Sequence, residues 1–116
     1  MENKRPFIDH LIIEVFGVPF KLNQFKNSDE KLKEFINKCN LNVVKEEGHD
    51  FSQFGFTRIF ILSESHIIFH SWPDYKYLHI DLMSCNKRIS DSKIKKIAKE
   101  VFGSENLHIN KIKYQK

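Results

Sequence analysis

The sequence predicts an α+β domain in which a mainly antiparallel sheet carries two helices on one face. Two helical patterns, over residues 28–39 and 90–103, are separated and flanked by alternating or continuous apolar segments typical of strands. No internal repeat or Pro/Gly-rich linker divides the 116 residues. With 41% hydrophobic and 13% aromatic residues, the chain can bury a core of its own. We therefore expect one domain over residues 1–116.

The first half of the chain predicts a strand, a helix and a second strand. Phe7–Val18 is rich in Ile, Phe and Val, and Pro19 is a natural stop for a strand there. Ser28 is placed to cap the following helix, whose first turn is acidic. A short strand over Leu41–Glu47 and a polar connection over residues 48–53 follow. The apolar stripe of the helix consists of Leu32, Phe35, Ile36 and Cys39, which makes Cys39 a core residue.

The second half predicts three strands, a helix and a closing strand. Gly55–Ser63 and His66–Trp72 have the composition of buried strands, and Tyr75–Cys85 alternates with Leu78, Ile80 and Leu82 on one face. Ser90 or Asp91 caps the second helix, Gly103 ends it, and Leu107–Tyr114 closes the sheet. The helices leave the other sheet face bare, so we expect that face to meet a partner sheet or to form a site. From the alternating strand it receives Tyr77, His79, Asp81, Met83 and Cys85.

Composition excludes several classes of protein. The net charge is +4, but the lysines are dispersed, and the densest cluster (Lys93 to Lys99) falls on the solvent face of a helix, so nucleic acid is not an expected partner. Cys39 and Cys85 form neither a disulfide framework nor a CxxC metal pair. No apolar run approaches the roughly 18 residues that span a bilayer. We expect a reduced, cytoplasmic protein that is not bound to membranes.

Residues 62–75 place hydroxyls, imidazoles and acids in a segment otherwise built for a buried strand, which is costly unless these groups are paired or functional. Three general interpretations are open. His66 and His70 have the spacing of metal ligands on a helix, although the β-branched run between them favours a strand. Ser65, His70 and Asp81 could form a hydrolase triad, although no GxSxG elbow is present. The residues could also be satisfied polar groups in a half-buried sheet.

The whole segment resembles the signature of prokaryotic-type S-adenosylmethionine decarboxylases. Residues 64–66 are Glu-Ser-His, and residues 70–74 are His-Ser-Trp-Pro-Asp where the family has His-Thr-Trp-Pro-Glu. An Asp and a Cys follow at the family's separation, at Asp81 and Cys85. Residues 48–51 and 55–57 resemble upstream segments of the family, and residues 10–11 lie where its fold begins. The resemblance spans nearly the full chain, so we favour this family over the metal and hydrolase alternatives.

The resemblance implies that the chain cleaves itself at Glu64-Ser65. The Ser65 hydroxyl attacks the Glu64 carbonyl, the resulting ester breaks by β-elimination, and hydrolysis leaves a covalent pyruvoyl group and ammonia. The products are a β chain (1–64) and an α chain (65–116). His70 resembles the residue that assists processing by proton transfer, and Thr57 matches a hydroxyl that supports it. Residues 65 and 70 have opposite parity in a strand, so we predict a bend or bulge at Glu64-Ser65.

The mature enzyme implied by the family decarboxylates S-adenosylmethionine and supplies the aminopropyl donor for spermidine synthesis. The pyruvoyl carbonyl at residue 65 forms a Schiff base with the substrate, so no pyridoxal phosphate or metal is needed. Cys85 resembles the catalytic proton donor. Phe51 resembles the platform for the adenine ring. Asp74 stands where a Glu of the family recognises the substrate, and we expect it to contact the ribose hydroxyls. A homodimer with sites built from both protomers is the expected assembly.

Several positions depart from the family pattern. Ser71 replaces Thr, Asp74 replaces Glu, and Arg58 and Asn86 stand where the family usually has Gly; Arg58 is the odd one, beside Thr57 in the sequence. These departures leave the substrate less secure than the cleavage chemistry. Two alternatives are therefore open: a pyruvoyl-dependent decarboxylase of ornithine or arginine, and an unprocessed, non-catalytic homologue.

Overall fold

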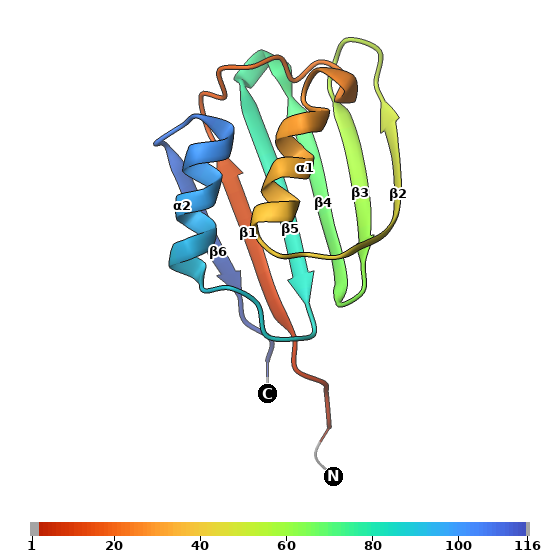
Figure 1. Ribbon diagram of the computed structural model, residues 1–116, viewed down its shortest axis with the longest axis vertical. Coiled ribbons are helices and arrows are strands. Elements are labelled where there is room, and N and C mark those ends of the chain that lie inside the picture. Colours follow the sequence, from red (N-terminus) through yellow and green to blue (C-terminus); the bar gives the residue numbers. More distant parts are fainter. Residues whose placement is uncertain (1–2, 116) are drawn as a thin grey trace.

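Six strands form one antiparallel sheet, and two helices pack on the same face of it (Figure 1). The computed structural model describes residues 3–115. The first two residues and the last residue of the expected domain, Met1, Glu2 and Lys116, lie outside the described residues. The elements are β1 (Asp9–Val15), α1 (Asp29–Lys38), β2 (Val43–Asp50), β3 (Phe56–Leu62), β4 (Ser65–Trp72), β5 (Tyr77–Ser84), α2 (Asp91–Phe102) and β6 (Leu107–Ile112). In space the strands follow the order β2-β3-β4-β5-β1-β6. The predicted fold class is confirmed.

The core lies between the sheet and the helices. In β5 the alternation is as predicted, because Leu78, Ile80 and Leu82 are fully buried while the residues between them are half-buried on the other face. Phe35 of α1 packs against Phe69 of β4 and Phe102 of α2, with ring centroids 6.4 and 5.1 Å apart. Each buried aromatic side chain contributes about 1.5–3 kcal/mol relative to exposure, so this layer stabilises the packing of both helices on the sheet.

The helix ends follow from local chemistry. At the start of α2, the Ser90 hydroxyl accepts a hydrogen bond from the Lys93 N–H at 3.3 Å, so Ser90 is the cap and not Asp91. Gly103 ends α2 with a φ of 66°. Ser28 precedes α1 as predicted, but its hydroxyl donates to the Phe25 carbonyl (3.4 Å) and does not cap the helix. Neither described helix has the length and apolar character to cross a membrane.

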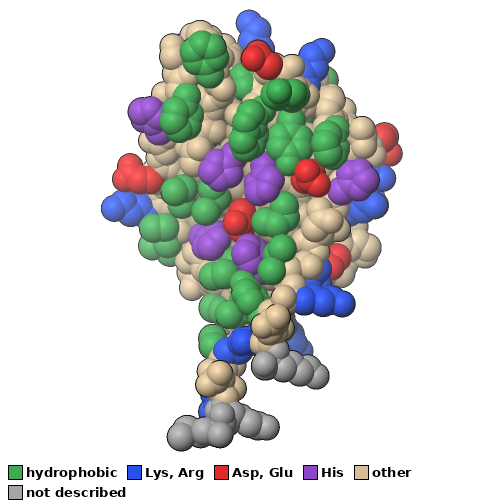
Figure 2. All heavy atoms as spheres, turned by 180° about the vertical axis from the view of Figure 1, so that it is seen from behind, with side chains coloured by type: hydrophobic (Ala, Val, Ile, Leu, Met, Phe, Trp, Pro, Cys, Tyr) green, Lys and Arg blue, Asp and Glu red, His purple; other side chains and the backbone are tan. Residues whose placement is uncertain are grey.

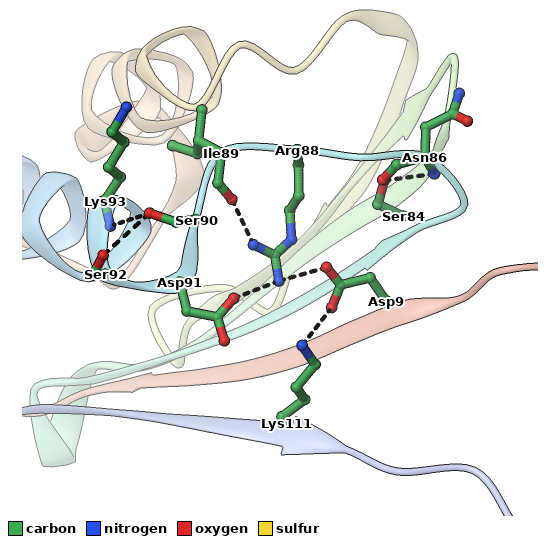
Figure 3. Close-up of polar contacts among 10 residues, drawn as sticks. All are labelled: Asp9, Ser84, Asn86, Arg88, Ile89, Ser90, Asp91, Ser92, Lys93 and Lys111. Carbon is green, nitrogen blue, oxygen red and sulfur yellow. Dashed lines mark hydrogen bonds and ion pairs between the residues drawn. The ribbon is translucent and has the colours of Figure 1, made fainter.

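A buried arginine fixes the entry to α2 against the sheet (Figure 3). One terminal nitrogen of Arg88 lies 2.7 Å from Asp9 of β1 and 2.8 Å from Asp91 in the first turn of α2. Lys111 of β6 lies 3.7 Å from the other oxygen of Asp9. The Arg88 side chain is only 5% exposed, and a guanidinium so buried is stable only with such partners. The cluster ties β1, β6 and α2 together at one end of the sheet.

Every predicted strand differs from the structure in its bounds, and the difference is largest for β1 and β2. β1 ends at Val15, short of the predicted end at residue 18, because Gly17 adopts a φ of 67° that ends the extended backbone. β2 runs to Asp50, into the first half of the predicted polar connection, and all eight of its residues are exposed. β2 is an edge strand without a buried face, so it lacks the alternation that marks a strand in the sequence.

Candidate active site

The sheet face opposite the helices carries a group of histidines around one carboxylate (Figure 2). Because side chains alternate along a strand, every second residue of β1, β4 and β5 reaches this face. These side chains are half-buried, apart from the exposed Trp72 at the end of β4. We call this surface the open face of the sheet. Its polar residues near the centre are His10, His66, His70, His79 and Asp81.

Asp81 pairs with two of these histidines. One of its oxygens lies 2.7 Å from Nε2 of His10 and 3.5 Å from Nε2 of His66. Nδ1 of His10 also shares a hydrogen bond with the Tyr114 hydroxyl at 2.8 Å. Asp81 therefore orients His10 through a hydrogen bond, whereas His66 lies only at ion-pair distance from it. No hydrogen bond joins Asp81 to His70 within the described residues. The hydrolase triad considered from the sequence is not assembled.

The side chains of Thr57 and His70 are joined by a hydrogen bond. They face each other across β3 and β4, with 3.0 Å between Oγ1 of Thr57 and Nδ1 of His70. Burial lowers the pKa of His70, and the neighbouring His79 lowers it further, while the Asp81 carboxylate opposes the shift. His70 is therefore biased toward the neutral form, which accepts a proton.

Glu64, Ser65 and Cys85 lie together at the end of the sheet where β3 turns into β4. Leu62 pairs with Ser65, so Ser63 and Glu64 form a two-residue turn. Ser65 has a φ of 148°, a backbone conformation that only glycine adopts without strain. The Glu64 carbonyl accepts a hydrogen bond from the backbone N–H of Cys85 at 2.8 Å. The Cys85 side chain, just beyond the end of β5, is exposed.

The predicted bend at Glu64-Ser65 is present as this turn, but it does not bring Ser65 to His70. Both residues belong to β4, five positions apart, so about 17 Å separates them along the strand. They also alternate to opposite faces. His66 and His70 share the open face but lie about 13 Å apart, too far to ligate one metal ion. No group of three metal-ligating side chains is found in the described part of the chain.

Phe51 and Asp74 lie at the opposite end of the sheet from Ser65. Phe51 follows β2 in an exposed loop, and its ring centroid is 4.7 Å from that of His49. Asp74 is exposed in the 3₁₀ turn Pro73–Tyr75 that follows β4. The structure thus divides the predicted site residues into three groups along β4: the Ser65 end, the Thr57–His70 pair, and the Phe51 and Asp74 end.

Arg58 has a structural role on the helix-covered side, away from Thr57. Its guanidinium lies 3.9 Å from the centre of the Phe25 ring and 3.6 Å from Glu46 of β2. Gly48 lies opposite it in β2, and a Cβ there would come within 2.5 Å of the Arg58 side chain. Arg58 is thus next to Thr57 in the sequence but points to the opposite face of the sheet.

His79 was assigned no role from the sequence, and nothing there grouped His10 and His66 around Asp81. For His79 the only signal was parity, which placed it with Asp81 on the bare face of one strand. His10 and His66 reach Asp81 from β1 and β4, on either side of β5 in the sheet. The proximity of these three residues depends on the order of the strands in the sheet, which cannot be predicted from the alternation within one strand.

Comparison with known proteins gives a consistent result. The family model described as S-adenosylmethionine decarboxylase matches residues 9–115. An S-adenosylmethionine decarboxylase proenzyme of Clostridium botulinum (strain Langeland) is 36% identical over 94 residues, covering 78% of this chain and 79% of that protein. One of Thermosipho africanus is 27% identical over 101 residues, covering 86% and 78%. The crystal structure of the adenosylmethionine decarboxylase from Aquifex aeolicus shares the fold, with a TM-score of 0.74, 19% identity, and coverage of 94% and 91%. The chain therefore belongs to the S-adenosylmethionine decarboxylase family.

Proposed function

We propose that this chain is a self-processing, pyruvoyl-dependent S-adenosylmethionine decarboxylase, cleaved between Glu64 and Ser65 into chains 1–64 and 65–116. One observation carries the proposal. The carbonyl of the scissile peptide already accepts the Cys85 N–H at 2.8 Å, and the next residue, Ser65, has a strained φ of 148°. A peptide bond is a poor electrophile, and both features favour attack on it.

Cleavage begins when the Ser65 hydroxyl attacks the Glu64 carbonyl carbon. Negative charge then develops on the oxygen that the Cys85 N–H holds, and this donor is fixed before the reaction starts. Nitrogen leaves the acyl carbon, and Glu64 becomes an ester on the Ser65 oxygen. A base removes the Cα proton of residue 65, the Glu64 carboxylate departs, and water replaces the nitrogen as ammonia. His70 is suited to act as this base, because Thr57 holds its ring by a hydrogen bond and because its lowered pKa favours the neutral form.

The chain's own side chains fit a pyruvoyl group at residue 65. Such a group supplies an electron sink for decarboxylation of a substrate with an α-amine. Cys85 lies next to residue 65 with an exposed side chain, which is suited to returning a proton to the product. Phe51 offers an exposed ring for stacking on adenine, and Asp74 offers a carboxylate for ribose hydroxyls. The product would be the aminopropyl donor for spermidine synthesis.

Two protomers complete the site in this proposal. About 17 Å along β4 separates Ser65 from His70, so the pair cannot act on each other within one chain. The open face also carries Ile12, Ile59 and Ile68 among its histidines, an apolar surface that a second sheet can cover. In a two-fold dimer of face-packed sheets, the Ser65 end of one protomer can meet the His70 and Asp74 region of its partner.

The direct test is the mass of the purified protein. We expect two chains that correspond to residues 1–64 and 65–116, with the second lacking a free amino terminus. Ser65→Ala, which removes the nucleophile, should stay in one piece while keeping its fold by circular dichroism. A folded wild-type chain that stays intact would overturn the catalytic proposal and favour the non-catalytic homologue.

The substrate needs a separate measurement, because the chemistry of the pyruvoyl group is indifferent to the side chain. Release of carbon dioxide from S-adenosylmethionine, ornithine and arginine should be compared with the processed enzyme. We expect S-adenosylmethionine to be used, with Phe51→Ala raising KM more than it lowers kcat because stacking contributes mainly to binding. Faster turnover of ornithine or arginine would instead support the alternative substrate, with Asp74 in place of the family's Glu as a departure that accompanies the change.

A further inference from the structure

Three side chains line up across the open face at the level of His70. Thr57 of β3 pairs in register with His70 of β4, and His70 pairs with His79 of β5. The two imidazole ring centroids are 5.9 Å apart, while Thr57 is bonded to the other side of His70 at 3.0 Å. Figure 2 shows the histidines gathered on this face. Glu14 of β1 is the next residue in the row, opposite His79.

The position of His79 is not accounted for by hydrogen bonding. Its Nδ1 is buried and has no hydrogen-bond partner among the described residues, and leaving such a group unpaired costs about 1–3 kcal/mol. Its ring packs instead between those of His70 and Tyr77, whose centroids lie 5.9 and 6.4 Å away. A residue that costs stability at the centre of a functional face is better explained by what it does to its neighbour.

Few charged groups face His70 from the neighbouring strands. β3 contributes only the Thr57 hydroxyl at this level, since Arg58 points to the other face. β5 contributes His79 and Asp81, and their charges act on His70 in opposite directions. Tyr77 of β5 stays neutral, because burial and the Glu14 carboxylate raise its pKa to about 12. After burial, His79 is thus the neighbour that lowers the pKa of His70.

We propose that His79 is a positioning residue for self-cleavage, a second imidazole that keeps His70 free to accept a proton. The inference rests on the proposed function of His70 and adds a residue to it. When His79 is protonated, a positive charge on His70 is disfavoured at this separation. His70 then holds no proton of its own when the Cα proton of residue 65 must be removed. His79 needs no contact with the scissile bond.

The first test compares the pH profile of cleavage in two matched variants. His79→Gln keeps a polar side chain of similar size but removes the imidazole ring. His108→Gln makes the same change at the exposed outer end of the same row, on β6. Removing the opposing charge should raise the pKa of His70, so the acidic limb of the profile should move to higher pH. His79→Gln should then cleave several-fold more slowly than wild type at about pH 6 and equally fast at about pH 8, which lie on either side of the ordinary histidine pKa of about 6.5. His108→Gln should cleave like wild type at both pH values.

A second measurement separates this inference from the proposed function. Nuclear magnetic resonance titration of the His70 ring in Ser65→Ala protein needs no cleavage, and adding His79→Gln should move that titration to higher pH. An unmoved His70 titration, or a cleavage profile identical to wild type, would overturn the role of His79. A wild-type chain that never cleaves would overturn the proposed function instead, while the titration still decides the coupling. Native circular dichroism of each variant excludes misfolding.

Discussion

The two cysteines of this chain lie in opposite environments, and the difference follows from where each side chain points. Cys39 ends the apolar stripe of α1 and is 1% exposed. Burial in this apolar layer raises the pKa of its thiol to about 12. Cys85 is exposed just beyond β5, and its backbone holds the Glu64 carbonyl. Only the second thiol is therefore available for chemistry.

Alkylation should distinguish the two thiols. Iodoacetamide near neutral pH should modify Cys85 in the folded, processed enzyme and leave Cys39 unmodified, because thiolate is the reactive form and Cys39 has almost none. Peptide mass mapping locates the label, and carbon dioxide release should fall in proportion to it. Cys85→Ala protein should remain unlabelled until it is denatured. Equal labelling of both thiols in the native state would contradict the assignment of Cys39 to the core.

At the scale of elements, the start of β3 depends on a glycine. Gly55 has a φ of 119°, and its N–H donates to the Asn23 carbonyl at 3.1 Å. A Cβ at this position would clash with the backbone carbonyl oxygen of Ser71 in β4. Glycine therefore permits β3 to approach β4 closely beside the loop that carries Phe51.

Two alanine substitutions should separate the clash from backbone strain. Gly55→Ala should lower the free energy of unfolding by about 3 kcal/mol, because it combines a disfavoured φ with overpacking against backbone. Gly17→Ala shares a positive φ (67°) but meets nothing within 4 Å, so it should cost only about 1 kcal/mol. Urea unfolding of both in the Ser65→Ala background avoids a mixture of cleaved and intact chains. Equal losses would show that the approach to Ser71 is unimportant.

At the scale of the whole molecule, the separation of Ser65 from His70 supports the proposal that each protomer works on its partner. Within one chain the two residues are about 17 Å apart along β4 and face opposite sides of the sheet. A dimer through the open face removes the separation along β4, because a two-fold axis can lay the Ser65 end of one sheet over the His70 region of its partner. The arrangement also explains why groups needed for one reaction are spread over both ends of the sheet.

Mixed dimers test this arrangement. Ser65→Ala and His70→Ala chains should each stay intact when expressed alone. When the two are co-expressed with different tags, the His70→Ala chain should be cleaved, because it keeps Ser65 and receives an intact His70 from its partner. The Ser65→Ala chain should remain whole. Isolation of mixed dimers in which neither chain is cleaved, beside a wild type that processes fully, would contradict cleavage between protomers.

Much of the fold was predictable because its signals are local. The apolar period of 3.6 in α1 and α2, the Ser90 cap and the Gly103 terminator are properties of short segments, and the structure confirms them. The alternation in β5 likewise predicted its two faces. β2 was misjudged at its end because an exposed edge strand has no buried face to impose a pattern.

By itself the sequence determined the layers of the domain, the family and the order of the reactive residues along the chain. Only the tertiary structure decided which of those residues meet: Cys85 with Glu64, Thr57 with His70, and His79 beside His70. Side-chain parity is written into each strand, whereas pairing partner and register depend on turns and core contacts between distant segments. For the same reason, the distance between Ser65 and His70 became a constraint on function only when both were found in one continuous strand.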